Sequence, residues 1–189
     1  KLATVRQFII IGDPAAFPGA ALDYEQLLHS ENADILFPDI DERAAAAMCY
    51  TSGTTGHPKG VVYSHRSTFM HTIGVQTGSG VPYTWNDRLL PIVPMFHANA
   101  WGLAHSTVMA GANFVMPGPD LSAPSLAALI ASERVTMAAG VPTIWQGVAA
   151  ELGKHDLSSL TRITCGGSAV PKALSETYRE QIGISILQG

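Results

Sequence analysis

Short apolar runs alternate with segments of helical spacing along most of the chain. The runs expected to form buried strands are residues 45–50, 88–93, 113–116, 135–139, 162–165 and 184–187. The segments between them that predict helices are residues 64–77, 100–110, 122–132, 144–152 and 172–181. Short strands that alternate with helices of about ten residues are typical of βαβ units. The pattern therefore predicts an α/β fold with a mostly parallel sheet flanked by helices.

The first part of the chain has a different pattern. Residues 5–11 form an apolar run that ends at Gly12-Asp13-Pro14, which predicts a buried strand and a turn. Residues 22–29 predict a short helix, and residues 30–41 are polar and predict a connector. We therefore expect residues 1–42 to be the end of a preceding sub-domain plus a connector, and residues 43–189 to form the main sub-domain. Both ends look cut, so we expect a fragment of a longer protein.

Composition narrows the classes of function. Hydrophobic residues make up 47% and charged residues 14%, which argues against disorder. The formal charge of −4 and the lack of a basic run give little support for nucleic-acid binding. No apolar run is long enough to predict a transmembrane segment. Cys49 and Cys165 lie in apolar runs, which favours buried free thiols and a cytoplasmic location, with one disulfide left open.

The strongest chemical signal is a loop rich in hydroxyls and glycines that ends in a lysine. Its residues are Thr51, Ser52, Gly53, Thr54, Thr55, Gly56 and, after His57-Pro58, Lys59. Such a loop can present backbone N–H groups, hydroxyls and one ammonium to a polyphosphate. It is not a Walker A loop, because Pro58 precedes the lysine and Gly60 follows it. The alternative is an ordinary loop between a strand and a helix.

This loop closely resembles the phosphate-binding signature of the adenylate-forming superfamily. That superfamily includes acyl-CoA synthetases, firefly-type luciferases and non-ribosomal peptide adenylation domains, and the resemblance covers nearly all of residues 44–189. It implies that 51–56 and Lys59 bind ATP, that Thr51 and Lys59 act in catalysis, and that Thr51 helps to place Mg²⁺. It also implies that residues 43–189 are an AMP-binding sub-domain of an acyl-CoA synthetase-like N-terminal domain, incomplete at its C-terminal end.

A second segment, Pro94-Met95-Phe96-His97-Ala98-Asn99-Ala100-Trp101, follows a predicted buried strand. His97 and Trp101 are four positions apart and would share one face if a helix has begun by His97. The resemblance implies that His97 borders the carboxylate of the substrate and that Trp101 gates an acyl tunnel, as in fatty acyl-CoA synthetases. The alternative is a buried histidine packed on an aromatic core. Gly140 and Val141 would suit the wall of a narrow acyl channel or, equally, a plain turn.

The last motif lies near the end of the chain. Gly167, Ser168 and Ala169 resemble the family's adenine-binding loop, and Gln188-Gly189 resembles the start of its next motif. The family's Thr-Glu motif, ribose-binding Asp and C-terminal Lys lie beyond this chain. We therefore expect the isolated fragment to be inactive.

These observations predict a fragment of an ATP-dependent acid:CoA ligase that releases AMP and pyrophosphate and uses ATP, Mg²⁺ and CoA. Trp101 beside small residues, with no added charge nearby, favours an apolar medium- or long-chain fatty acid. Two alternatives stay open. One is a ligase for an aryl or small acid, such as a sulfur-containing propionic acid, and the other is a non-catalytic nucleotide-binding module. A homodimer of the complete protein also stays open.

Overall fold

The computed structural model describes residues 4–51, 56–78 and 80–189. The chain divides into two compact units, Lys1–Ile40 and Asp41–Gly189. The division falls at the end of the polar stretch 30–41. Each unit is described by itself below.

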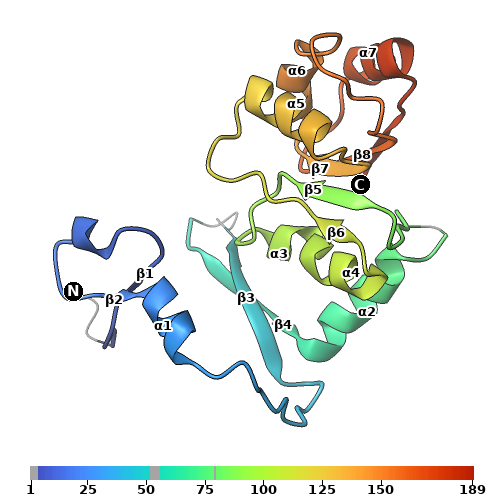
Figure 1. The fold of residues 1–189 in the computed structure, drawn as a ribbon. Helices are drawn as coiled ribbons and strands as arrows, with labels where there is room; N and C mark the ends of the chain where they lie inside the picture. The colour runs from blue at the N-terminus through green and yellow to red at the C-terminus, as the bar shows by residue number, and fades with distance from the viewer. Residues whose placement is uncertain (1–3, 52–55, 79) are drawn as a thin grey trace. The chain divides into compact units, whose positions relative to one another are not determined.

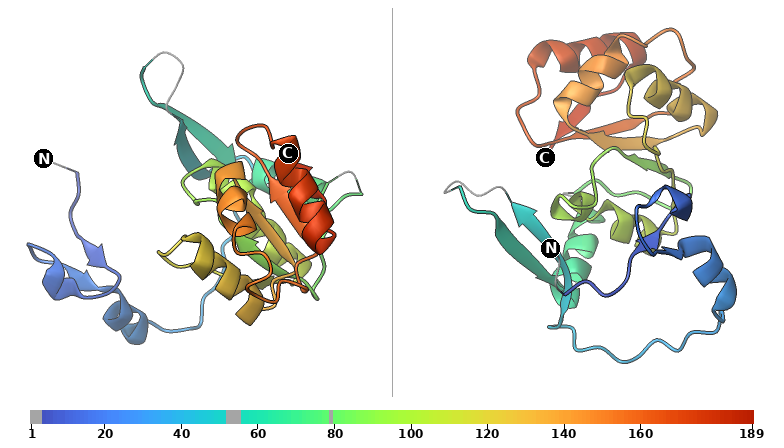
Figure 2. Two further views of the ribbon diagram at one scale, coloured as in Figure 1. Left: turned by 90° about the horizontal axis from the view of Figure 1, so that it is seen from above. Right: turned by 90° about the vertical axis from the view of Figure 1, so that its left-hand side faces the viewer.

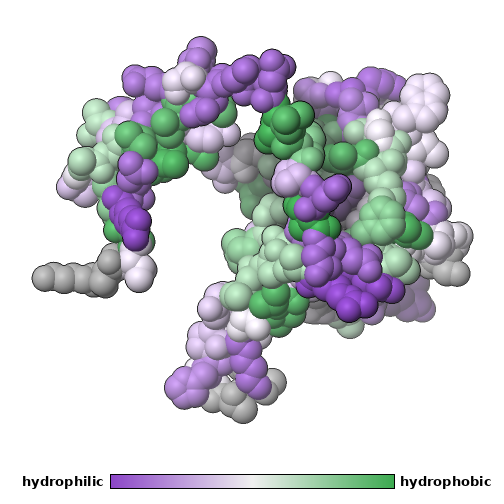
Figure 3. All heavy atoms as spheres, turned by 90° about the horizontal axis from the view of Figure 1, so that it is seen from below, coloured by the Kyte–Doolittle hydropathy of each residue, from purple (hydrophilic) through white to green (hydrophobic). Residues whose placement is uncertain are grey.

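The N-terminal unit holds two short parallel strands, β1 (Ile9–Ile10) and β2 (Leu22–Asp23), a 3₁₀ turn at Pro14–Ala16 and helix α1 (Tyr24–Ser30). The buried strand predicted over residues 5–11 is wrong in extent, because Ile9 and Ile11 remain 53% and 77% exposed. Helix α1 begins after Asp23, whose carboxylate accepts hydrogen bonds from the N–H groups of Glu25 and Gln26. The N-terminal unit exposes hydrophobic side chains, which are drawn in green in Figure 3.

The larger unit begins with an antiparallel hairpin of β3 (Ala45–Thr51) and β4 (Lys59–Ser64). The predicted order of strand, loop and helix did not include β4, and residues 45–50 belong to this antiparallel hairpin and not to the parallel alternation. In β4 the β-branched residues Val61 and Val62 lie opposite Cys49 and Met48 of β3. β-Branched residues favour strands, which explains why this segment adopts an extended conformation. Ser64 then caps helix α2 (His65–Val75) by accepting from the N–H of Ser67.

The main sheet is parallel throughout and has the order β6-β5-β7-β8-β9. Its strands in chain order are β5 (Arg88–Pro91), β6 (Asn113–Phe114), β7 (Met137–Gly140), β8 (Arg162–Cys165) and β9 (Ile186–Gln188). Helices α5 (Ala123–Ser132), α6 (Pro142–Ala149) and α7 (Lys172–Ile182) cover one face, and α2, α3 (Ala98–Trp101) and α4 (Leu103–Ala110) lie on the other (Figures 1 and 2). This architecture confirms the predicted α/β fold.

The two faces of the sheet carry separate apolar cores, because alternate residues of a strand point to opposite faces. Leu90, Ala138 and Ile163 pack under α5, α6 and α7 in the larger core. Leu89, Met137 and Ala139 belong to the smaller core with Leu103 of α4. The smaller core therefore lies between the sheet and the helices that carry the pocket segment.

A polar cluster closes the amino-terminal edge of this sheet. The carboxylate of Asp87 accepts from the N–H of Thr84 and the hydroxyl of Thr136, both over 2.7 Å, and forms an ion pair with Arg162. Burial would by itself raise the pKa of Asp87, but the hydrogen bonds and the Arg162 charge together hold that pKa below its ordinary value.

Replacing Asp87 with Asn is expected to lower the free energy of unfolding by about 1–3 kcal/mol, because charged and polar partners lose their shared acceptor. A lowered carboxyl pKa stabilises the fold above the unfolded pKa of about 3.9 and loses its effect as the pH falls through the folded value. The difference in melting temperature between the parent and Asp87→Asn should therefore be constant from neutral pH to about pH 5 and shrink below about pH 4. A difference that grows in acid would contradict this assignment.

Candidate active site

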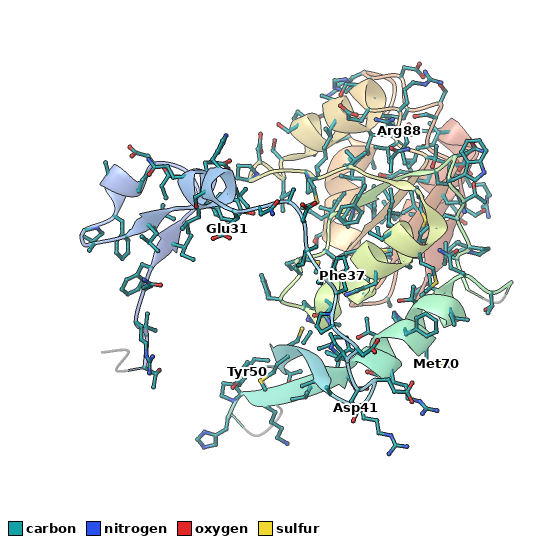
Figure 4. The ribbon with its side chains drawn as sticks, turned by 60° about the horizontal axis from the view of Figure 1, so that its bottom comes forward. Glu31, Phe37, Asp41, Tyr50, Met70 and Arg88 are labelled. Carbon is teal, nitrogen blue, oxygen red and sulfur yellow. The ribbon has the colours of Figure 1, made fainter. Side chains whose placement is uncertain are left out.

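The hairpin brings two predicted phosphate-binding residues together. Thr51 ends β3, Lys59 begins β4, and the two are direct partners in the antiparallel register. Both side chains are exposed, as is Tyr50 one position earlier (Figure 4). Ser52, Gly53, Thr54 and Thr55 lie outside the described residues, and Gly56 has a left-handed backbone with φ of +82°. The base of the loop thus holds a hydroxyl and an ammonium side by side, which suits an anionic ligand.

Cys49 connects this hairpin to the pocket segment. Its buried thiol donates to Oδ1 of Asn99 over 3.2 Å and lies 4.0 Å from the carbonyl oxygen of Met95. Both cysteines are free and buried, and burial raises the pKa of the Cys165 thiol to about 11. The two thiols therefore contribute to packing inside the protein.

The pocket segment has an unusual backbone. Ala98, Asn99, Ala100 and Trp101 have φ between +46° and +56°, so they form one left-handed turn. Left-handed backbone costs roughly 1–2 kcal/mol per residue with a side chain, so tertiary contacts must hold this turn. The helix predicted over residues 100–110 begins later, at Leu103 of α4. The condition for a shared face of His97 and Trp101, a helix that has begun by His97, is not met, because residues 98–101 form the left-handed turn. His97 is exposed at the start of the turn, and Trp101 is half-buried at its end.

An apolar cavity of ≈ 340 Å³ lies beside Trp101, between the parallel sheet and α2. Its lining residues are His71, Val75, Gly80, Val81, Trp101, Leu103, Met137, Thr164, Gly166, Gly167 and Gly189. Trp101 also lines a second cavity of ≈ 400 Å³, together with polar side chains that include Tyr63, Thr68 and His105. The indole therefore borders both cavities.

Helix α2 contributes to this site directly. The Nε2 atom of His71 donates to the carbonyl oxygen of Trp101 over 3.0 Å, and His71 lines both cavities. The imidazole packs so closely that a Cβ on Gly102 would lie 2.5 Å from its Cδ2 atom. The sequence analysis missed His71, because no local spacing relates α2 to the turn at Trp101.

The predicted adenine loop lies at the carboxyl edge of the same sheet. Oε1 of Gln188 accepts from the N–H of Val170 over 3.0 Å, and the N–H of Gly189 donates to the carbonyl of Cys165 over 2.9 Å. A Cβ on Gly166 would lie 3.1 Å from the Trp101 ring. The predicted loop of Gly167, Ser168 and Ala169 is thus adjacent to Gln188 and Gly189 and close to Trp101. Ligands of open α/β sheets bind at this edge.

Several predicted residues do not line the apolar cavity. His97 and Val141 are not among its lining residues, and neither is Gly140. A Cβ on Gly140 would point toward Trp145 and Ile92 in the larger core, on the opposite face of the sheet. Val141 is 37% exposed, and its Cγ1 would lie 3.3 Å from a Cβ on Gly167. The roles proposed for these three residues remain predictions.

Few residues in the described part of the chain could coordinate a magnesium ion. Residues 4–51, 56–78 and 80–189 contain no group of three or more His, Cys, Asp or Glu side chains that could hold a metal. Thr51 offers a single hydroxyl, whereas Mg²⁺ in nucleotide sites takes one or two carboxylates together with phosphate oxygens. The described residues do not form a complete magnesium site. No helix in this described part of the chain is long and apolar enough to cross a membrane.

The chain is similar to known enzymes. The family model described as AMP-binding enzyme matches residues 2–189. A 3-methylmercaptopropionyl-CoA ligase of Ruegeria lacuscaerulensis is 44% identical over 97% of this chain and 35% of its own length. A medium-chain-fatty-acid–CoA ligase of Ectopseudomonas oleovorans is 43% identical over 99% of this chain and 35% of its own length.

A solved structure agrees with the sequence comparisons. The inhibitor-bound N-terminal domain of FACL13 from Mycobacterium tuberculosis superimposes with a TM-score of 0.77 at 30% identity, over 87% of this chain and 41% of that one. This chain spans about a third of the length of the curated relatives that it matches. The sequence match and the shared fold together show that the chain belongs to the AMP-binding enzyme family.

Proposed function

We propose that the complete protein is an AMP-forming acid:CoA ligase. A carboxylate oxygen of the substrate attacks the α-phosphorus of ATP and pyrophosphate leaves, which yields an acyl-adenylate. The thiol of CoA then attacks the acyl carbon and AMP leaves. The observation that carries this proposal is the placement of an apolar cavity directly beside the Gly166–Ala169 loop and Gln188, at the edge of the sheet where ligands bind.

The residues of this chain have distinct roles in the proposed reaction. The exposed Lys59 ammonium, the hydroxyl of Thr51 and the loop from Ser52 to Gly56 bind the phosphates and stabilise charge that develops on them. Gly167, Ser168 and Ala169 with Gln188 and Gly189 bind the adenine side. His97 and Trp101 position the acid, with Gly140 and Val141 nearby. Mg²⁺ bound with ATP would supply charge neutralisation, and Thr51 would add one oxygen ligand to it.

The acid is an apolar medium- or long-chain fatty acid. Among the described residues that line the cavity there is no Lys, Arg, Asp or Glu, and Val75, Val81, Leu103 and Met137 are apolar. A second candidate is a small sulfur-containing propionic acid, which the 44% identical relative favours by its name. Residues 43–189 serve as the AMP-binding sub-domain of a cytoplasmic enzyme, and the isolated chain is inactive without the remainder of the protein.

Pyrophosphate exchange into ATP by the complete protein tests this function. We expect exchange that depends on an aliphatic acid, measured from butanoate to palmitate, and AMP release that depends on CoA. The highest kcat/KM with 3-methylmercaptopropionate would favour the second candidate. Preference for an amino acid or a dicarboxylic acid would overturn the apolar assignment, and a complete protein that binds ATP but adenylates no acid would support a non-catalytic module.

A further inference from the structure

Thr164 lines the apolar cavity, and its hydroxyl has no hydrogen-bond partner in residues 4–51, 56–78 and 80–189. The side chain of this β8 residue lines the cavity, while its Oγ1 atom is buried without a hydrogen bond among the described residues. The hydroxyls of two other buried threonines do form hydrogen bonds. The hydroxyl of Thr72 donates to the carbonyl of Thr68, and that of Thr107 donates to the carbonyl of Leu103. An unpaired buried hydroxyl is costly, so such a group calls for an explanation.

The position of Thr164 in the sheet explains why its hydroxyl is unpaired. Its partners on the two neighbouring strands are Ala139 and Leu187, and neither side chain can accept a hydrogen bond. The side chains of paired residues in a parallel sheet point to the same face, which here is the face of the smaller core. The space across from Thr164 is the cavity itself. A change of the χ1 rotamer exchanges methyl and hydroxyl, so the Oγ1 atom can turn toward a molecule in that space.

The location also bears on the proposed substrate. Thr164 precedes Gly166 by two residues of extended chain, which is about 6–7 Å. Gly166 borders Trp101 and the adenine loop, where the carboxyl group of the substrate would be activated. In the proposed function, Thr164 would therefore face the acyl chain and not the reacting carboxyl group.

We propose that the Thr164 hydroxyl determines specificity by donating a hydrogen bond to an acceptor atom within the acyl chain. The inference rests on the proposed acid:CoA ligase function. Within the apolar acids of the proposed function, it assigns a preference for chains that carry an ether oxygen or a thioether sulfur over alkanoic chains of the same length. A site whose polar group is left unpaired discriminates against the analogue that lacks the matching group.

Scanning a heteroatom along the chain tests this assignment. The complete protein and its Thr164→Val variant would be assayed with alkanoic acids and with mono-oxa and mono-thia analogues of equal length, the heteroatom placed at successive positions. Val keeps the shape of Thr and has a methyl group in place of the hydroxyl. Thr164→Ser restores the hydroxyl, and Thr177→Val on α7 is a matched control, because the Thr177 hydroxyl only donates to the carbonyl of Ala173.

We expect one heteroatom position at which the oxa-to-alkanoate ratio of kcat/KM falls about threefold to tenfold in Thr164→Val. The thia analogue should show a smaller fall, because a thioether is a weak acceptor. Thr164→Ser and Thr177→Val should keep the parent ratio. Equal ratios for the parent and Thr164→Val at every position would overturn the inference and leave the ligase function intact.

Two further outcomes also test the role of the Thr164 hydroxyl. Thr164→Val should be at least as stable as the parent, because an unpaired hydroxyl has no bond to lose. A variant that fails to fold, with Thr164→Ala failing likewise, would reveal a structural partner and overturn the inference. A parent protein that adenylates no carboxylic acid would overturn the ligase function and the inference with it.

Discussion

Replacing Lys59 with Met in the complete protein is expected to slow acyl-adenylate formation by about 10²–10³-fold. Loss of one preorganised charge donor at a developing oxyanion has effects of that size. Lys59 pairs with Thr51 at the base of the phosphate loop, so its ammonium is the charge that the described part of the loop offers to ATP. Single-turnover formation of the adenylate, measured at saturating ATP, separates this loss from weaker nucleotide binding.

Folding should not be affected by this change. The Lys59 side chain is exposed, and exposed substitutions usually shift stability by no more than about 0.5 kcal/mol. Lys154→Met is the matched control, because Lys154 is also exposed and only pairs with Glu151 over 3.1 Å. Unchanged adenylate formation in Lys59→Met, with Lys154→Met also unchanged, would refute the phosphate-binding role of the hairpin.

Gly102→Ala is expected to lower the free energy of unfolding by about 2–5 kcal/mol and to raise KM for the acid. Gly102 has φ of +72°, where a side chain costs about 1–2 kcal/mol. Its new Cβ would also lie 2.5 Å from the Cδ2 atom of His71, and overpacking adds about 1–3 kcal/mol. Because Gly102 follows Trp101, relief of this clash would displace the indole from the cavity. Thermal unfolding and initial rates across acid concentrations measure the two effects.

A double-mutant cycle separates backbone strain from the clash. Gly102→Ala in a His71→Ala background should lose only the backbone part, about 1–2 kcal/mol. Gly153→Ala is the control for strain alone, since Gly153 has φ of +83° and nothing within 4 Å of the position of a Cβ. Equal losses for Gly102→Ala in both backgrounds would show that His71 does not constrain the turn.

Regular elements of the larger unit were largely predictable from local pattern. The apolar runs of β5, β7 and β8 and the helices α5, α6 and α7 lie within a few residues of their predicted positions. In each of them the hydrophobic residues recur with the period of a strand or of a helix, because one face of the element is buried. Strand β4 was missed because the hydroxyl-rich loop before it is typical of a turn that leads into a helix. Pairing with β3 instead makes residues 59–64 a strand.

The candidate site was less predictable. The left-handed turn at Ala98–Trp101 has no local signal, because none of its residues is a glycine. Contacts from Cys49 on β3 and from His71 on α2 hold the turn from outside the segment. His71 and Thr164 likewise enter the site only through packing between α2 and the sheet.

By itself the sequence determined the parallel α/β architecture, the family resemblance and the chemical groups of the phosphate loop. These follow from hydrophobic period and from residue types in a fixed order, which are local properties of the chain. The tertiary structure alone decided which side chains surround the cavity and how the backbone turns at Trp101. Such features depend on contacts between residues about 30 to 120 positions apart, and no local pattern encodes which distant surfaces will meet.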